Sequence, residues 1–228
     1  MKRLVEQGER VTIVTACTAD WPADRALTPA IHKEHDQWQL GDRPYRARRL
    51  EDAAATHVLG ATALHLNLPD AIYRFNAQGQ PLYVRDFMGI APHPDDWKVQ
   101  AIALAAQLTQ TVLIEGAHIY CPLAVGRHVD HTIVRQVTEV IFPAERIIYY
   151  EDYPYADQPA ALLQETSQLK HAHSSSIQLS PAELAVRIEA ISCYHSQVRV
   201  MFGNNTQMAE RLRAYVGNSL IERYWKAN

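Results

Sequence analysis

Short apolar runs that suit buried strands alternate with helical patterns as far as residue 150, and this alternation constrains the fold more than any other feature of the sequence. Residues 11–17 are apolar and β-branched, whereas residues 45–59 place apolar and alanine side chains at helical spacing before a glycine. Further strand patterns cover residues 62–68, 111–122 and 146–150, and further helical patterns cover residues 95–110 and 129–142. Such alternation predicts an α/β fold, a Rossmann-like sandwich with a mainly parallel sheet.

The length of 228 residues favours a single domain that spans residues 1–228. Helical patterns at 158–171, 181–202 and 206–216 predict a helical C-terminal part, residues 157–228, packed on that domain. Ligands of α/β folds bind beyond the carboxyl ends of the strands. Functional side chains are therefore expected in the loops at that edge.

Composition excludes several classes of function. The net charge of −3 provides no basic surface for nucleic acid. The three cysteines are far apart and form no CxxC pair, which argues against a cysteine zinc site and favours a reducing compartment. The sequence shows neither an apolar leader nor the roughly 20 apolar residues of a membrane span. We interpret the chain as cytoplasmic and without a membrane partner; a homo-oligomer is compatible with the sequence.

The densest cluster of functional side chains is residues 122–131, between a strand pattern and a helical pattern. There His128 and His131 flank Asp130 in an HxDH sequence. Imidazole is the commonest metal ligand, and a neighbouring carboxylate can orient a ring or cap a helix. From the spacing alone, a metal or acid–base site and a plain helix cap are equally open. We interpret four other histidines as having no functional role: His32, His35, His57 and His65.

Six segments, in order along nearly the whole chain, resemble the PIG-L/LmbE-like family of zinc-dependent N-deacetylases. The segment GRHVDH, after a strand and a proline, resembles the second metal motif of that family. The other segments are GERVTIVTACTAD at 8–20, RRLE at 48–51 with the following Leu59-Gly60, HLNLPD at 65–70, YYEDYPYA at 149–156, and YHSQ at 194–197 with ERYW at 222–225.

The resemblance implies hydrolysis of an N-acetyl or other N-acyl group from an amino sugar or a similar small amide. The cofactor would be Zn2+, which activates a bound water for attack on the amide carbonyl. His131 is then expected to be a metal ligand, and His128 to stabilise the oxyanion or protonate the leaving amine. Asp130 is expected to hold a histidine in its tautomer. The partner would be a small N-acetylated molecule of the sugar class.

Arg48 and Asp70 are expected, on the same resemblance, to bind substrate hydroxyls. Each residue also suits a simpler role. Arg48 and Glu51 are spaced i,i+3 on a helix, the spacing of a solvated salt bridge. Asp70 follows Pro69, as a turn residue often does.

The tetrapeptide HPDD at 93–96 matches the first metal motif of the family in sequence but not in position. In one interpretation, His93 and Asp96 are metal ligands and Asp95 is the general base. In the other, Asp95 and Asp96 begin the helix at 95–110, where carboxylates cap the end and favour the helix dipole. The poor strand pattern before this segment favours the helix start.

The resemblance places the HPDD strand of the family before the segment with which this chain opens. Residues 1–6 resemble the end of a helix, with Gly8 as its cap. We therefore expect the chain to lack that strand and half of the metal site. The alternative to an active deacetylase is an inactive relative or truncated remnant that acts as a ligand-binding or interaction protein.

Overall fold

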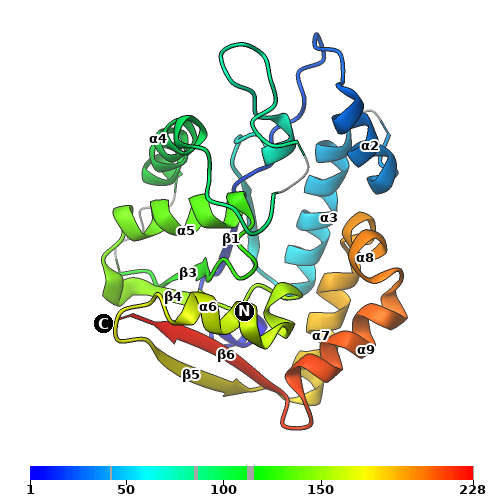
Figure 1. The fold of residues 1–228 in the computed structure, drawn as a ribbon. Coiled ribbons are helices and arrows are strands. Elements are labelled where there is room, and N and C mark those ends of the chain that lie inside the picture. The colour runs from blue at the N-terminus through cyan, green and yellow to red at the C-terminus, as the bar shows by residue number, and fades with distance from the viewer. Residues whose placement is uncertain (42, 85–86, 112–115, 228) are drawn as a thin grey trace. The chain divides into compact units, whose positions relative to one another are not determined.

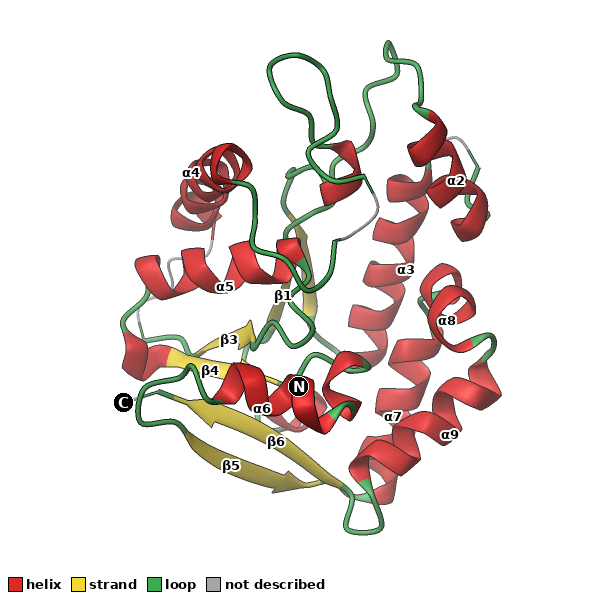
Figure 2. Cartoon of the chain, in the orientation of Figure 1, coloured by secondary structure: helices red, strands yellow, loops and turns green. Residues whose placement is uncertain are grey.

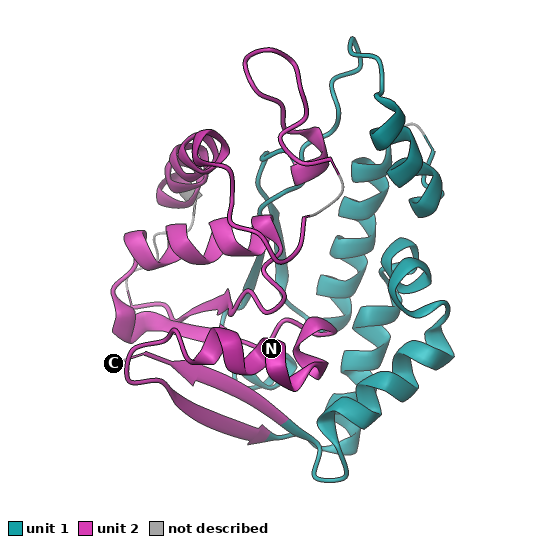
Figure 3. Cartoon of the chain, in the orientation of Figure 1, with its two compact units in different colours: residues 1–69, 178–221 teal, residues 70–177, 222–228 magenta. Residues whose placement is uncertain are grey.

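The computed structural model describes residues 1–41, 43–84, 87–111 and 116–227 (Figure 1). They form two compact units, residues 1–69 with 178–221 and residues 70–177 with 222–228 (Figure 3). Each unit combines helices with strands, and parallel pairing dominates. The α/β fold class is therefore confirmed, whereas a single domain over 1–228 stays a prediction.

The first unit contains one pair of parallel strands and the helices around it. Thr12 lies beside Thr62 at one end of the pair, and Thr15 lies beside His65 at the other. The elements are α1 (Lys2–Glu6), β1 (Thr12–Thr15), α2 (Pro29–Trp38), α3 (Pro44–Leu59), β2 (Thr62–His65), α7 (Pro181–Ser192), α8 (His195–Phe202) and α9 (Asn205–Val216). Helix α3 packs against both β2 and α7.

Local sequence signals explain the helix ends of the first unit. Pro44 occupies the first turn of α3, where its missing N–H leaves no bond unmade, and Gly60 ends the helix in the left-handed region at φ 72°. Ser180 and Glu183 form a reciprocal capping box at the start of α7.

The helical pattern at 181–202 is divided into α7 and α8. The carboxylate of Glu51, on α3, accepts hydrogen bonds from the backbone N–H (2.9 Å) and hydroxyl (2.7 Å) of Ser196. These bonds satisfy donors in the first turn of α8, so a new helix begins there. The division is a tertiary effect that the local sequence pattern does not contain.

The second unit holds a four-stranded sheet in the order β3-β4-β6-β5 (Figure 2). Its elements are η1 (Ala71–Tyr73), α4 (Pro94–Thr111), β3 (Ile119–Pro122), α5 (Val129–Ile141), η2 (Ala144–Arg146), β4 (Ile147–Tyr150), η3 (Tyr155–Asp157), α6 (Pro159–Thr166), β5 (His173–Gln178) and β6 (Ile221–Lys226), where η marks a 3-10 helix. Of the strand pattern at 111–122, residues 112–115 lie outside the described residues.

The C-terminal part is not purely helical, since it supplies β5 and β6. Strand β6 pairs with β4 in the antiparallel direction. Most side chains of β5 are exposed and polar, so the strand has none of the apolar alternation by which a strand is identified in sequence. None of the helices in the described ranges combines the length and apolar character that a bilayer-spanning segment needs.

Strands β3 and β4 position the candidate site. They run in parallel and end together, with Pro122 beside Tyr150. The chain therefore leaves both strands at the same edge, where the loop to α5 meets the segment that follows β4. Helix α5 packs against β3, and α4 packs against α5.

Candidate functional site

The loop that joins β3 to α5 has an unusual backbone. Ala124, Gly126 and Arg127 have φ values of 61°, 82° and 53°. Alanine and arginine seldom adopt this left-handed conformation, because the Cβ atom approaches backbone oxygen. Such strain persists only where surrounding contacts hold the chain in place.

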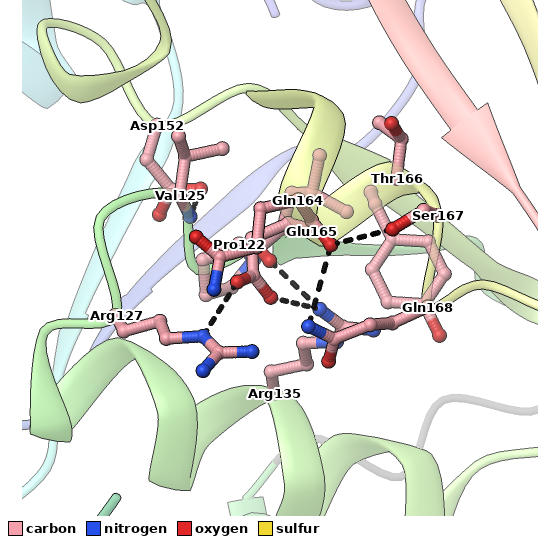
Figure 4. Close-up of polar contacts among 12 residues, drawn as sticks. Pro122, Val125, Arg127, Arg135, Asp152, Gln164, Glu165, Thr166, Ser167 and Gln168 are labelled. Atoms are coloured by element: carbon pink, nitrogen blue, oxygen red, sulfur yellow. Dashed lines mark hydrogen bonds and ion pairs between the residues drawn. The ribbon is translucent and has the colours of Figure 1, made fainter. Parts of the chain in front are cut away.

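Four hydrogen bonds hold this loop in place (Figure 4). The buried carboxylate of Glu165, on α6, accepts from Arg127 Nε at 2.8 Å and from Arg135 Nη1 at 3.3 Å. Arg135 Nη1 also donates to the carbonyl of Leu123 at 2.9 Å. The backbone N–H of Val125 donates to Asp152 Oδ2 at 3.1 Å. The loop is thus fixed from α5, from α6 and from the segment after β4.

A second segment of the same unit covers the loop. The N–H of Val129 donates to the carbonyl of Phe87 at 2.9 Å, and the N–H of Gly89 donates to the carbonyl of Gly126 at 3.0 Å. The ring of Phe87 stacks on the ring of His128, with 6.1 Å between centroids. These contacts fix the position of the His128 ring.

His131 lies in the first turn of α5 and is oriented by Asp152, two residues beyond β4. Its Nδ1 atom is 2.6 Å from Asp152 Oδ1, and 38% of its side chain is exposed. Because the carboxylate only accepts, Nδ1 carries the proton, and in the neutral ring Nε2 keeps its lone pair. Burial lowers the pKa of His131, but the hydrogen bond and charge of Asp152, with the charges of Asp130 and Asp70, raise it overall.

His128 is held in the opposite tautomer. It is the N-cap of α5, and its Nδ1 atom accepts from the backbone N–H of Asp130 at 3.2 Å. In the neutral ring the proton is therefore on Nε2. Burial lowers the pKa of His128 and favours this neutral form, against the opposing charge of Asp130. The two rings are 5.3 Å apart, one presenting an N–H donor and the other a lone pair.

The carboxylate of Asp130 is bound by groups other than the two imidazoles. The carboxylate forms an ion pair with Arg74 Nη2 at 2.5 Å and accepts from the N–H of Ala71 at 3.3 Å. Its nearest approach to His128 Nδ1 is 4.0 Å, beyond hydrogen-bond distance. Burial raises the pKa of Asp130, although Arg74 acts to lower it. The side-chain bond that would fix a histidine tautomer comes from Asp152 and reaches His131.

The described residues do not by themselves make a zinc site. Nε2 of His131 suits one position in such a site, since a carboxylate on the other ring nitrogen is the usual arrangement for a metal-binding histidine. A catalytic zinc needs about three protein ligands. In the described ranges no group of three or more His, Cys, Asp or Glu side chains is arranged to hold a metal ion.

The HPDD residues take up the start of α4. The Nδ1 atom of His93 accepts from the N–H of Asp95 at 3.3 Å, and the side chain of Asp95 is 85% exposed. Asp96 is buried, and its Oδ2 atom accepts from Arg74 at 2.9 Å and from Tyr83 at 2.8 Å. This geometry favours a helix start over a metal site. The hydrogen bonds from Arg74 and Tyr83 give the Asp96 carboxylate a structural role.

The two expected substrate-binding residues lie in different units. Arg48 donates to the hydroxyl of Tyr45 at 2.9 Å, and its guanidinium lies 4.9 Å from the ring centroid of Trp38. Asp70 accepts from the N–H of Ile72 at 3.2 Å, and its charge acts on His128 and His131. The second unit thus brings Asp70 to the HxDH histidines, whereas Arg48 belongs to an aromatic cluster of the first unit.

His65 proves to be part of a polar network at the carboxyl ends of β1 and β2. Its Nε2 atom is 2.8 Å from Asp52 Oδ2. The other oxygen of this buried carboxylate accepts from Thr15 at 3.1 Å and from Tyr194 at 2.7 Å. The network ties α3 to both strands and to the start of α8.

Two residues important to the site, Arg74 and Glu165, carry no local signal that singles them out. Asp152 does carry one, because it lies two residues beyond a strand pattern, at the edge where α/β folds bind ligands.

Comparisons with known proteins agree with this architecture. No family profile and no curated protein sequence matches the chain. Among solved structures, a zinc-inhibited form of the teicoplanin deacetylase Orf2 has a TM-score of 0.82 at 21% identity, over 98% of this chain and 89% of that one. The A40926 pseudoaglycone deacetylase Dbv21 has a TM-score of 0.71 at 22% identity, over 99% and 88%. A deacetylase–teicoplanin complex gives 0.76 at 19% identity, over 99% and 90%. The chain shares the fold of these deacetylases.

Proposed function

We propose that this chain carries a PIG-L/LmbE-type N-deacetylase site for an N-acetylated amino sugar, free or attached to a larger small molecule. The observation that carries the proposal is the pair of adjacent imidazoles with opposite tautomers. His128 offers an N–H donor, and His131 offers a lone pair backed by a buried carboxylate. The motif order along the chain and the fold shared with teicoplanin and A40926 deacetylases support the same reaction.

The reaction is hydrolysis of an amide. The oxygen of water bonds to the acetyl carbon, the carbon–nitrogen bond breaks, and the products are acetate and the free amine of the sugar. His128 would donate its Nε2 proton to the oxyanion or to the departing nitrogen, which is the role of a positioned acid. We assign Asp70, beside this pair, to the binding of substrate hydroxyls. The same role for Arg48, which lies in the first unit, stays a prediction.

Zinc would supply activation of the attacking water, as the sequence resemblance implies. His131 is the single ligand that the described residues offer from a matched position. A complete site would need further donors, so no step of the reaction is assigned to the metal. His131 is expected to be needed for any zinc that binds.

The test is release of free amine from a panel of N-acetylated amino sugars and their glycosides, assayed over a range of zinc concentrations because zinc inhibits a structural neighbour. His128→Ala should lower kcat by about 10²-fold or more, and His131→Ala should abolish turnover and zinc binding. His118→Ala is the matched control, since His118 is exposed at the amino end of β3. Turnover that survives His131→Ala would contradict the proposal.

A catalytically inactive relative that binds the same class of ligand is the second candidate. The observation in its favour is that no group of three or more metal-ligand side chains accompanies His131 among the described residues. Calorimetry with the same panel separates the two. Binding of an N-acetylated sugar without amine release, at every zinc concentration, would favour the inactive relative.

A further inference from the structure

We propose that Arg74 fixes the tautomer of His128 by holding the Asp130 carboxylate away from the imidazole. Arg74 is a positioning residue in this proposal, because it acts through Asp130 and need not touch a substrate. The inference concerns the hydrogen bonds of the chain itself, so it can fail or succeed independently of the deacetylase function.

Arg74 joins two buried carboxylates from different helices. Its Nη2 atom is 2.5 Å from Asp130 Oδ1 on α5, and its Nη1 atom is 2.9 Å from Asp96 Oδ2 on α4. The side chain of Arg74 is 2% exposed, and those of Asp96 and Asp130 are 1% and 9% exposed. The guanidinium thus donates a hydrogen bond to Asp96 and forms an ion pair with Asp130, and a compact ammonium group cannot reach both carboxylates equally well.

Tyr83 fixes the position of Asp96, the second carboxylate that Arg74 contacts. The hydroxyl of Tyr83 donates to Asp96 Oδ2 at 2.8 Å and accepts from the N–H of His93 at 2.9 Å. Asp96 therefore has a fixed position from which to orient Arg74. This contact gives the second aspartate of HPDD a purpose that is neither metal binding nor catalysis.

The backbone N–H and the carboxylate of Asp130 both lie near Nδ1 of His128. The ion pair with Arg74 determines which of the two bonds to that atom. That atom now accepts from the backbone N–H of Asp130 at 3.2 Å, so the neutral ring carries its proton on Nε2. The carboxylate of the same residue lies 4.0 Å away. A buried carboxylate that loses its charged partner is costly. If Arg74 released it, the N–H of Ala71 would remain, and the nearest further donor would be an Nδ1–H of His128.

That rearrangement would exchange one proton for another. Nε2 would lose its proton to solvent, Nδ1 would take one up, and the ring would stay neutral. The backbone N–H of Asp130 would lose its acceptor. Nε2 would then present a lone pair, so His128 would become an acceptor where a donor is required.

The test is two-dimensional proton–nitrogen NMR of the histidine rings in the full chain, at a pH where His128 is neutral. Wild type should show the proton on Nε2 of His128. Arg74→Lys keeps the charge but cannot serve both carboxylates equally, and should move the proton toward Nδ1. Asp96→Asn and Tyr83→Phe loosen Arg74 more gently and should give smaller shifts in the same direction. Arg146→Lys, at the amino end of β4, is the control.

Each outcome bears on the proposal. A proton on Nδ1 in wild type would overturn it at once. An unchanged Nε2–H in folded Arg74→Lys would also overturn it, and if that variant does not fold, Asp96→Asn and Tyr83→Phe decide in its place. If the deacetylase function holds, Arg74→Lys should also lower kcat by up to about 10²-fold with little change in KM. A tautomer shift without measurable activity in wild type would support the inference and count against the function.

Discussion

At the scale of single residues, Asp152 sets the chemistry of His131 through one short hydrogen bond. Because burial lowers the pKa of His131 and Asp152 raises it, Asp152→Asn should lower that pKa in the metal-free protein. Titration of the His131 ring protons by NMR measures this change. Asp95→Asn, whose side chain is 85% exposed, is the matched control and should leave the His131 titration unchanged.

A lower zinc affinity should accompany that change, by about 10- to 100-fold, as is typical when a carboxylate behind a metal-binding histidine is lost. An Asp152→Asn protein with the wild-type pKa for His131 would show that the 2.6 Å contact does not govern the ring.

Gly126 needs to be glycine because its φ is +82°. An added Cβ atom would lie 2.8 Å from Cε of Met88, but that atom is the end of a flexible side chain and can move aside. Gly126→Ala should therefore destabilise the protein by roughly 1–2 kcal/mol, the cost of a left-handed backbone. Gly79 provides the control, because its φ is +75° with no atom near the added Cβ. Urea unfolding should show similar losses for Gly79→Ala and Gly126→Ala, and a much larger loss for Gly126→Ala would mean that Met88 cannot move.

At the scale of elements, the start of α7 makes acid stability depend on Glu183. Hydrogen bonds from Arg3 and then from the N–H of Ser180 lower the pKa of Glu183 from 4.5 to about 2. The native state thus binds this proton less readily than the unfolded chain. The contribution to stability is present above about pH 4.5 and disappears as the pH falls toward 2.

Glu183→Gln isolates the ion pair, because glutamine retains the capping box. The variant should lose less than about 1 kcal/mol at pH 7, as is usual for partly exposed pairs, and should equal wild type near pH 2. Unfolding in urea at several pH values tests both statements. Glu189→Gln, exposed on the same helix, should leave the pH dependence intact. A difference that persists at pH 2 would point to the cap rather than to the charge.

At the scale of the whole molecule, the donor set predicts weak zinc binding by the 228-residue chain. Within the part of the chain that the structure describes, only His131 is supplied from a matched position, so less than one zinc per chain should remain after dialysis. His131→Ala should remove the remainder, and His93→Ala should not, because His93 begins α4. Atomic emission measures the zinc content of wild type and of both variants. Tight binding of one zinc that depends on His93 and Asp96 would restore HPDD as a metal motif.

The order of strands and helices could be predicted because local sequence patterns determine it. The strand at 12–15 is marked by β-branched residues, and α3 is marked by helical spacing and Gly60. By contrast, the sequence pattern does not predict β5, because the side chains of this strand are polar and exposed. The strand forms through its pairing with β6. The division between α7 and α8 was missed because Glu51, on another helix, causes it.

The sequence by itself determined that His128 and His131 stand between a strand and a helix, at the edge where an α/β fold binds ligands. Only the tertiary structure decided what each ring can do. Asp152 gives His131 its lone pair on Nε2, and Arg74 withdraws the Asp130 carboxylate from His128. The physical reason is that a tautomer depends on bonds of about 3 Å, and those bonds come from partners that lie many residues away along the chain.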